Sequence, residues 1–193
     1  MCIRDSLRTI VFGAGCFWSV EKKFQETFGV VDVKSGYADG KNIKPSYKEI
    51  IKSKNRFNPN NYAEVVKVTY NSNKTSLENL LMTFFEMHDP TQLNRQGNDI
   101  GVQYRSIILT SSKEESLLSS DIKVRYQELL SKKGYGPIRT VIKELTNFYL
   151  AENYHQDYLE KNPNGYCPDN STGVVFSKKI KNISNNQDLL IGK

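Results

Sequence analysis

The sequence predicts an α+β domain in which a sheet is covered by helices. Segments rich in β-branched residues alternate with amphipathic segments whose apolar residues recur at the helical period. Of the 193 residues, 38% are hydrophobic and 25% are charged, as in ordinary globular proteins. A chain of this length suits one hydrophobic core and is short for two.

The first two strands enclose a helix. Residues 7–12 are an apolar run and predict a buried strand. Residues 16–28 are apolar at helical spacing and precede Gly29, a frequent helix stop. Residues 30–38 predict a second strand, and a short helix is expected near 47–51.

A polar segment then separates the second strand from the third. Residues 52–61 contain a proline and predict a surface loop. Residues 63–70 alternate and are rich in β-branched side chains, as in a strand. Thr75 and Glu78 have the spacing of a capping box and predict the start of a helix.

The remaining pattern predicts two more strands and two more helices. Residues 104–110 and 138–145 have the composition of strands. Ser112 and Glu115 form a second capping-box pattern and open a long helix. A short helix is expected at 152–159, after which Gly, Pro, Asn and Ser predict coil.

We expect one catalytic domain over residues 7–176. Residues 1–6 (MCIRDS) look like a translated sequencing adaptor and are interpreted as non-native, Cys2 included. Residues 177–193 hold four lysines and one acid, so half of the net charge of +6 lies there. We expect this segment to be a basic, flexible tail.

The sequence favours neither nucleic acid nor membranes as partners. No stripe of Arg and Lys interleaved with aromatic residues is found. No apolar run approaches the roughly 18 residues of a membrane span, and the N-terminus has no secretory pattern. The expectation is a cytoplasmic monomer.

Cys16 is the first candidate for chemistry. It follows Gly13 and Gly15 at a predicted helix start, where free N–H groups and the helix dipole lower the pKa of a thiol. Phe17 and Trp18 can form an apolar slot beside the sulfur. The alternative is that all three residues pack in the core, because free cysteines are commonly buried.

Cys167 is a candidate redox partner of Cys16. It lies in a turn-rich segment that can move onto another residue. In such a pair, one cysteine is oxidised to sulfenic acid and the second condenses with it to a disulfide. The alternative is that Cys167 is a bystander.

Three further residues fit the reduction of a polar atom. Apolar surroundings at Glu64 would raise the pKa of its carboxyl and let it donate a proton. Tyr47 and Tyr104 can donate hydrogen bonds to an oxygen. The alternatives are an exposed carboxylate and ordinary tyrosine packing.

The long polar loop at 88–106 is of a kind that is often functional, the alternative being a plain connector. His88 and His155 lack the spacing of zinc ligands, so no metal site is expected.

Five segments resemble the type A peptide methionine sulfoxide reductases. They are GCFWSVE, SGYADG, YAEVVKVTY, HDPTQLNRQGNDIGVQYRS and AENYHQDYLEKNPNGYC, in the family's order between Thr9 and Cys167. The resemblance implies a ferredoxin-like α+β fold, a two-layer sheet covered by helices with a long coiled C-terminal segment. It also implies protein repair by reduction of the S epimer of methionine sulfoxide, free or in proteins. Thioredoxin would be the reductant, with no metal or organic cofactor.

The resemblance also implies residue roles. Cys16 would attack the sulfoxide sulfur, Glu64 would protonate the leaving oxygen, and Cys167 would resolve the sulfenic acid through a Cys16–Cys167 disulfide. The remaining residues would bind substrate: Phe17 and Trp18 around the methyl group, Tyr47 and Tyr104 at the oxygen, and Asp99 organising the site.

The sequence departs from the family pattern in a few places. Tyr62 replaces a usual histidine, and the loop at 52–61 looks longer, so the family's loop geometry and substrate preference are not carried over to this chain. Asp39 and Ser19 stand where glycines are usual. Val175 occupies the place of a second recycling cysteine found in some members, so one resolving cysteine is expected.

Two other functions are compatible with the same residues. A cysteine hydrolase or acyltransferase would use Cys16 as nucleophile and His155 as base, and would not need Cys167. A basic binding protein would contact nucleic acid or acidic partners through residues 177–193 and would need no activated thiol.

Overall fold

The structure is a computed structural model that describes residues 6–41 and 43–176. The segment interpreted as an adaptor lies outside the described residues except for Ser6, and so does Cys2. The basic tail predicted at 177–193 also lies outside them. Among the described residues no helix is long and apolar enough to cross a membrane.

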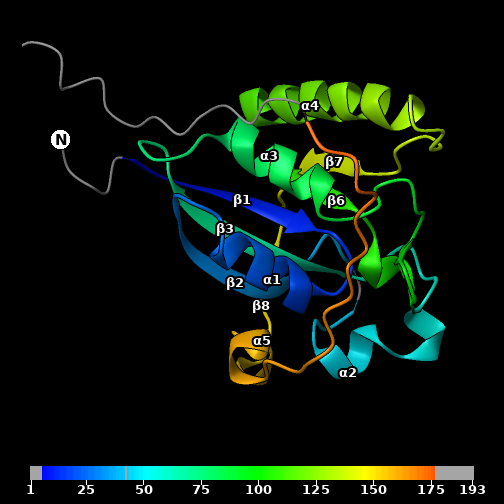
Figure 1. Cartoon of the computed structure of the whole chain (residues 1–193). Coiled ribbons are helices and arrows are strands. Elements are labelled where there is room, and N and C mark those ends of the chain that lie inside the picture. Colours follow the sequence, from blue (N-terminus) through cyan, green and yellow to red (C-terminus); the bar gives the residue numbers. More distant parts are fainter. Residues whose placement is uncertain (1–5, 42, 177–193) are drawn as a thin grey trace, which may run out of the picture.

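The described chain forms a mixed α+β fold around a six-stranded sheet, which confirms the predicted class (Figure 1). Its strands are β1 (Leu7–Gly13), β2 (Val30–Ala38), β3 (Ala63–Asn71), β6 (Ile107–Thr110), β7 (Val141–Glu144) and β8 (Phe148–Leu150). The spatial order is β7-β6-β1-β3-β2-β8. All neighbouring strands are antiparallel except the β6–β7 pair. β4 (Arg95–Gln96) and β5 (Asp99–Ile100) form a separate small hairpin.

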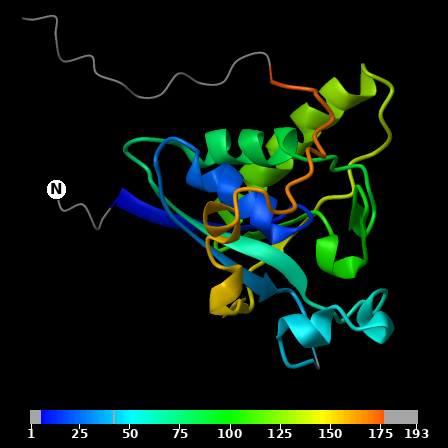
Figure 2. The ribbon, with the colours of Figure 1, turned by 60° about the horizontal axis from the view of Figure 1, so that its bottom comes forward.

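Five α-helices and several 3-10 turns lie in the described part of the chain. The helices are α1 (Phe17–Gln25), α2 (Tyr47–Ile50), α3 (Leu77–Glu86), α4 (Lys113–Ser131) and α5 (Tyr158–Lys161). The 3-10 turns include η2 (Ser53–Asn55), η3 (Val102–Tyr104) and η4 (Asn153–His155). Residues 162–176 contain no helix or strand and pass over α1 and α3 (Figure 2).

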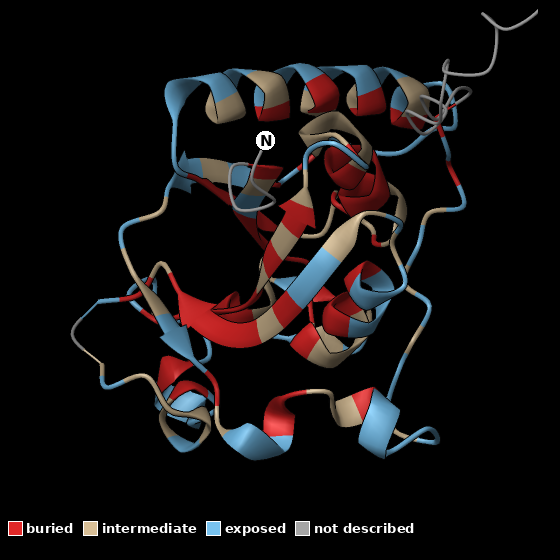
Figure 3. Ribbon diagram, turned by 90° about the vertical axis from the view of Figure 1, so that its left-hand side faces the viewer, coloured by how far each residue is buried: buried red, intermediate tan, exposed pale blue. Residues whose placement is uncertain are grey.

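The main core lies between the sheet and helices α1 and α3. The ring of Phe12 on β1 stacks on Phe24 of α1 and on Phe84 of α3, with ring centroids 5.0 Å apart in both pairs. The helices turn their buried residues toward the sheet and their exposed residues outward (Figure 3). Val11, the neighbour of Phe12, faces a smaller cluster on the other side of the sheet, as strand alternation requires.

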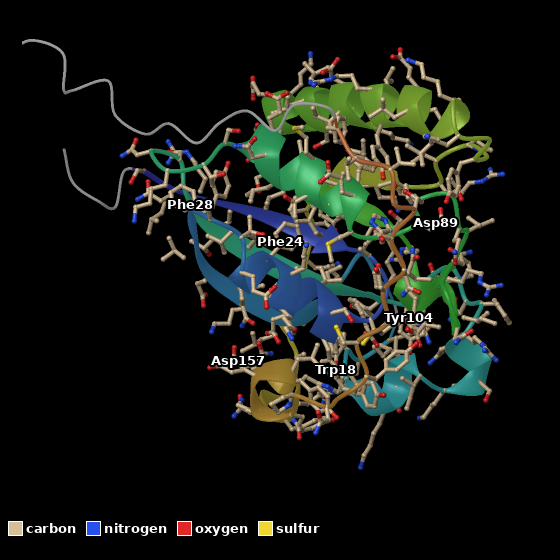
Figure 4. The ribbon with its side chains drawn as sticks, viewed as in Figure 1. Trp18, Phe24, Phe28, Asp89, Tyr104 and Asp157 are labelled. Carbon is tan, nitrogen blue, oxygen red and sulfur yellow. The ribbon has the colours of Figure 1, made fainter. Side chains whose placement is uncertain are left out.

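Most predicted elements exist, but several boundaries differ. The first helix ends at Gln25 rather than near residue 28, and Phe28 lies beyond it with 56% of its surface exposed (Figure 4). The capping box predicted at Thr75 is wrong. The N-cap is Ser76, whose hydroxyl accepts from the amide of Asn79 at 3.2 Å, while Thr75 is buried.

The boundaries of the elements after residue 100 differ more from the predicted ones. The strand predicted at 104–110 begins at Ile107, because the preceding residues form the turn η3. The strand predicted at 138–145 is shorter, and the helix predicted at 152–159 is divided into η4 and α5. Strands β4, β5 and β8 were not predicted. They have two or three residues each, too few to show a periodic pattern.

Candidate active site

Two glycines place Cys16 at the start of α1. Gly15 has φ +93°, which favours glycine, and turns the chain from β1 into the helix, whose N-cap is Cys16. Gly13 allows β1 to lie close to β3, because a Cβ atom there would stand 2.9 Å from the carbonyl oxygen of Glu64. The turn therefore brings Cys16 beside the strand that carries the candidate acid.

Glu64 is a buried carboxyl that contacts the start of the same helix. Its side chain lies on β3, the residue is 2% exposed, and Oε2 accepts from the backbone N–H of Phe17 at 3.2 Å. Burial, together with the charge of Asp99, raises the pKa of Glu64 to about 8 despite that hydrogen bond. The carboxyl is therefore protonated at neutral pH, as the sequence argument required.

A cavity of about 370 Å³ unites the candidate residues around these two groups. Its walls are Cys16, Phe17, Trp18, Tyr47, Glu64, Asp99, Tyr104 and Tyr166. Seven of these residues were predicted from the sequence, and they come from α1, α2, β3, β5 and η3. Figure 4 shows Trp18 and Tyr104 on the same side of the molecule, where the C-terminal segment crosses.

The thiol of Cys16 does not have the lowered pKa that the sequence predicted. Burial and the neighbouring carboxyls of Glu64 and Asp99 raise the pKa of Cys16 above its ordinary value. The backbone N–H groups of Trp18 and Ser19 at the helix start act in the opposite direction, but the effect of burial is larger. The prediction is wrong because the helix terminus lies in a site that other segments enclose.

The two tyrosines of the cavity remain hydrogen-bond donors. Burial and the nearby Glu64 carboxyl raise the pKa of both Tyr47 and Tyr104. Their hydroxyls therefore keep their protons at any physiological pH. Each can donate to an oxygen held in the cavity.

Aromatic contacts hold Trp18 against the rest of the site. The Tyr158 ring stacks on the indole, with ring centroids 3.8 Å apart. The indole Nε1–H donates to Nδ1 of His155 at 3.1 Å, and the His155 ring also packs against Phe17 and Tyr47. His155 therefore supports the apolar wall and does not itself line the cavity.

Cys167 lies apart from the cavity. Both Cys16 and Cys167 are free thiols, and Cys167 is exposed. Cys167 lines a second groove between α1, α3 and the C-terminal segment, together with Ser19 and Met87. The structure thus brings seven of the eight predicted site residues together and leaves the eighth outside.

Sequence reasoning missed Tyr166, His155 as a partner of Trp18, and Tyr158. Tyr166 precedes Cys167 directly and interacts with Asp99, an interaction that opposes the rise in the pKa of Asp99 caused by burial. Its place beside a candidate cysteine was a usable signal. The contacts of Trp18 with residues more than 130 positions away left no local pattern.

The departures from the family pattern have structural counterparts. Tyr62 is buried between Gly40 and Tyr149 and does not line the cavity. Asp39 has φ +53°, a conformation that glycine adopts without strain. Ser19 lies in the groove of Cys167, with its hydroxyl buried and unpartnered.

No group of three or more His, Cys, Asp or Glu side chains is placed to hold a metal ion within residues 6–41 and 43–176.

Known proteins resemble this chain in sequence and in fold. The family model described as "Peptide methionine sulfoxide reductase" matches residues 8–187. The Homo sapiens "Mitochondrial peptide methionine sulfoxide reductase" is 49% identical over 177 residues, which cover 92% of this chain and 73% of the relative.

Solved structures give the same result. "Methionine sulfoxide reductase A of Corynebacterium diphtheriae" is 40% identical, with a TM-score of 0.77 over 88% of this chain and 82% of that one. Reduced Mxr1 from Saccharomyces cerevisiae is 35% identical, with a TM-score of 0.76 over 89% of this chain and 94% of that one. Mxr1 has also been solved in complex with Trx2; that structure has a TM-score of 0.56 at 26% identity over 86% of this chain and 88% of that one.

Proposed function

This chain belongs to the peptide methionine sulfoxide reductase family, and from that membership we propose that its cavity reduces the S epimer of methionine sulfoxide. The enzyme is an oxidoreductase that repairs methionine sulfoxide by thiol chemistry. The observation that carries the proposal is the pairing of Cys16 with a buried, protonated Glu64 in one cavity.

Glu64 supplies the proton that the reaction needs. Sulfoxide oxygen leaves poorly unless it is protonated. A carboxyl with a pKa of about 8 holds its proton at neutral pH and can donate it. Tyr47 and Tyr104 support this step, since their hydroxyls donate hydrogen bonds to the same oxygen.

Cys16 accepts the oxygen atom. Its sulfur attacks the sulfoxide sulfur and forms a transient sulfur–sulfur bond. The oxygen then moves to the Cys16 sulfur: its bond to the substrate sulfur and the transient sulfur–sulfur bond both break, and Cys16 becomes a sulfenic acid. The sulfoxide is reduced to a thioether. The thiol proton of Cys16 replaces the proton that Glu64 gives to the oxygen, so no net proton is consumed.

The raised pKa of Cys16 is compatible with this sequence. In the free site, the buried thiol and its acidic neighbours keep the proton on sulfur. When Glu64 has given its proton to the bound sulfoxide oxygen, its carboxylate becomes the acceptor for the proton of Cys16. Deprotonation of Cys16 is thereby coupled to the arrival of substrate, which protects the resting thiol from other electrophiles.

The apolar wall selects the substrate's orientation. Phe17 and Trp18 face the cavity, and Trp18 is fixed by Tyr158 and His155. A cavity that combines an apolar wall with two hydroxyl donors can hold the methyl group and the oxygen of one substrate in different places. We assign preference for one epimer to this asymmetry, and Asp99 to organising the site with Tyr166.

Cys167 then resolves the sulfenic acid. Its thiol condenses with the Cys16 sulfenic acid, releasing water and forming a Cys16–Cys167 disulfide. The segment 162–176 has no regular structure that would oppose the required movement. Thioredoxin reduces this disulfide, a role supported by the solved complex of the relative Mxr1 with Trx2.

The fold and location are proposed at a finer level as well. The order β1-α1-β2-β3-α3-β6, with strands β6-β1-β3-β2 adjacent, supports a ferredoxin-like core followed by a long coiled C-terminal segment. A cytoplasmic monomer stays a prediction from composition.

A hydrolase is disfavoured, because His155 accepts a hydrogen bond from Trp18 and does not line the cavity.

The proposed function is tested by turnover of separated epimers. Wild type and Cys16→Ser receive the S or R epimer of a blocked methionine sulfoxide, with dithiothreitol as reductant. Reduction of the S epimer alone, abolished in Cys16→Ser, is the expected result. Equal reduction of both epimers, or of neither by folded wild type, would contradict the proposal.

A further inference from the structure

Arg105 is a buried cation that joins three segments next to the cavity. Only 12% of its side chain is exposed. Nη1 donates to the carbonyl oxygens of Val102 at 2.7 Å and Asn61 at 3.2 Å. Nη2 donates to the carbonyl oxygen of Asp39 at 2.8 Å and to its Oδ2 atom at 3.0 Å. One planar guanidinium thus fixes four acceptors.

Each of these segments leads directly to a residue of the site. Val102 begins the turn η3, which ends at Tyr104, the neighbour of Arg105. Asn61 lies three residues before Glu64 on the chain that enters β3. Asp39 directly follows β2, and Tyr37 of that strand is the register partner of Glu64 on β3.

Asp39 orients the guanidinium. Its carboxylate is 18% exposed and also binds Nζ of Lys143 at 3.0 and 3.1 Å. Its backbone N–H donates to Oδ1 of Asn147 at 3.1 Å. Asp39 has φ +53°, in the left-handed region, which aspartate adopts more readily than most residues other than glycine and asparagine.

We propose that Arg105, oriented by Asp39, is a positioning residue that sets the Tyr104 hydroxyl relative to the Glu64 carboxyl. This inference rests on the proposed function, in which both groups act on the sulfoxide oxygen. Arg105 does not line the cavity, so it acts through Tyr104 and the start of β3 and does not touch substrate. Small displacements of such groups cost up to about 10²-fold in rate.

The geometry of the guanidinium matters more than its charge. Lysine keeps the charge but offers a single ammonium group, which cannot span acceptors on three segments. Arg105→Lys is therefore expected to lower kcat by about tenfold or more, with KM changed less. Arg125→Lys is the matched control, because Arg125 is a half-exposed arginine on α4 that is paired with Glu78.

A double-mutant cycle separates positioning from a general structural effect. If Arg105 acts through the Tyr104 hydroxyl, Tyr104→Phe removes the group that it positions. Arg105→Lys should then reduce kcat much less in the Tyr104→Phe background than in wild type. Reductions that multiply independently in the double variant would overturn the inference, as would wild-type kcat in Arg105→Lys.

Asp39→Gly keeps the proposal testable if the Arg105 variants do not fold. Glycine suits φ +53° but removes the carboxylate that orients Arg105. A decrease in kcat that disappears in the Tyr104→Phe background is expected, and no decrease would overturn the inference. Wild type inactive on the S epimer would refute the proposed function instead, so the two failures are distinguishable.

Discussion

Glu64→Gln should make the protein more stable at neutral pH while removing its activity. Burial raises the pKa of Glu64 from 4.5 to about 8, so at pH 7 the folded protein holds a proton that the unfolded chain has released. The folded pKa is raised, and stability is therefore lost as pH increases from 4.5 toward 8. Glutamine does not titrate and avoids this loss.

The magnitude follows from the two pKa values. Multiplying the interval between 4.5 and pH 7 by about 1.36 kcal/mol per pH unit gives about 3 kcal/mol of lost stability at pH 7. At pH 5 the same linkage gives less than about 1 kcal/mol. The Phe17 N–H keeps an acceptor in the variant, but the new buried amide N–H₂ costs about 1 kcal/mol at both pH values.

The assay is urea unfolding of wild type and Glu64→Gln at pH 5 and pH 7. The stability of the variant relative to wild type should increase by about 2.5 kcal/mol between the two pH values. Subtracting the two proteins removes the titration of groups that do not interact with Glu64, and Glu160→Gln, a change of an exposed glutamate on α5, serves as the control. If the two proteins respond to pH in parallel, the Glu64 carboxyl is ionised in the folded state and cannot be the acid.

Three further predictions concern the cysteines and the apolar wall. The pKa of Cys16 can be measured from its alkylation rate as a function of pH, with peptide mapping to identify the alkylated cysteine. We expect a pKa above the ordinary value of a thiol, and a lower one in Glu64→Gln. A wild-type pKa below the ordinary value would mean that the helix terminus outweighs burial. Cys167→Ser should stop after one turnover with thioredoxin yet continue with dithiothreitol, whereas sustained turnover with thioredoxin would exclude Cys167 as the resolving residue. His155→Phe keeps a ring but removes the acceptor of Trp18, so KM should rise by about 3- to 10-fold with little change in kcat. A collapse of kcat in a folded His155→Phe protein would instead support His155 as a base.

The sequence predicted the elements whose signal lies in consecutive residues. The strand at 63–71 alternates and is long enough to show it, and the glycine turn before Cys16 has a defined conformational requirement. The capping box was misplaced by one residue because Thr75 and Ser76 are both good N-caps, and burial of Thr75 decides between them. Such burial comes from tertiary packing and has no local signal.

The candidate site was likewise predicted only in part. The side-chain chemistry of Cys16 and Glu64 made them candidates on their own, whereas Asp99 was implied only by the resemblance to the family and Tyr166 was missed. The pKa of Cys16 could not be predicted, because its enclosure depends on Glu64, Asp99 and other segments distant in sequence. The positioning role of Arg105 could not be predicted for a similar reason. Three of its four hydrogen-bond acceptors are backbone carbonyl oxygens, which any residue could supply.

The central claim is that the sulfoxide oxygen is transferred to Cys16 with Glu64 as the proton donor. It is tested most directly by a single-turnover experiment on Cys167→Ser, in which sulfenic acid on Cys16 is trapped with dimedone and located by mass spectrometry. One trapped sulfenic acid for each thioether formed, with a rate at least about 10²-fold lower when Glu64→Gln is added, is the predicted result. Thioether formed without sulfenic acid on Cys16, or at an unchanged rate in the Glu64→Gln protein, would contradict it.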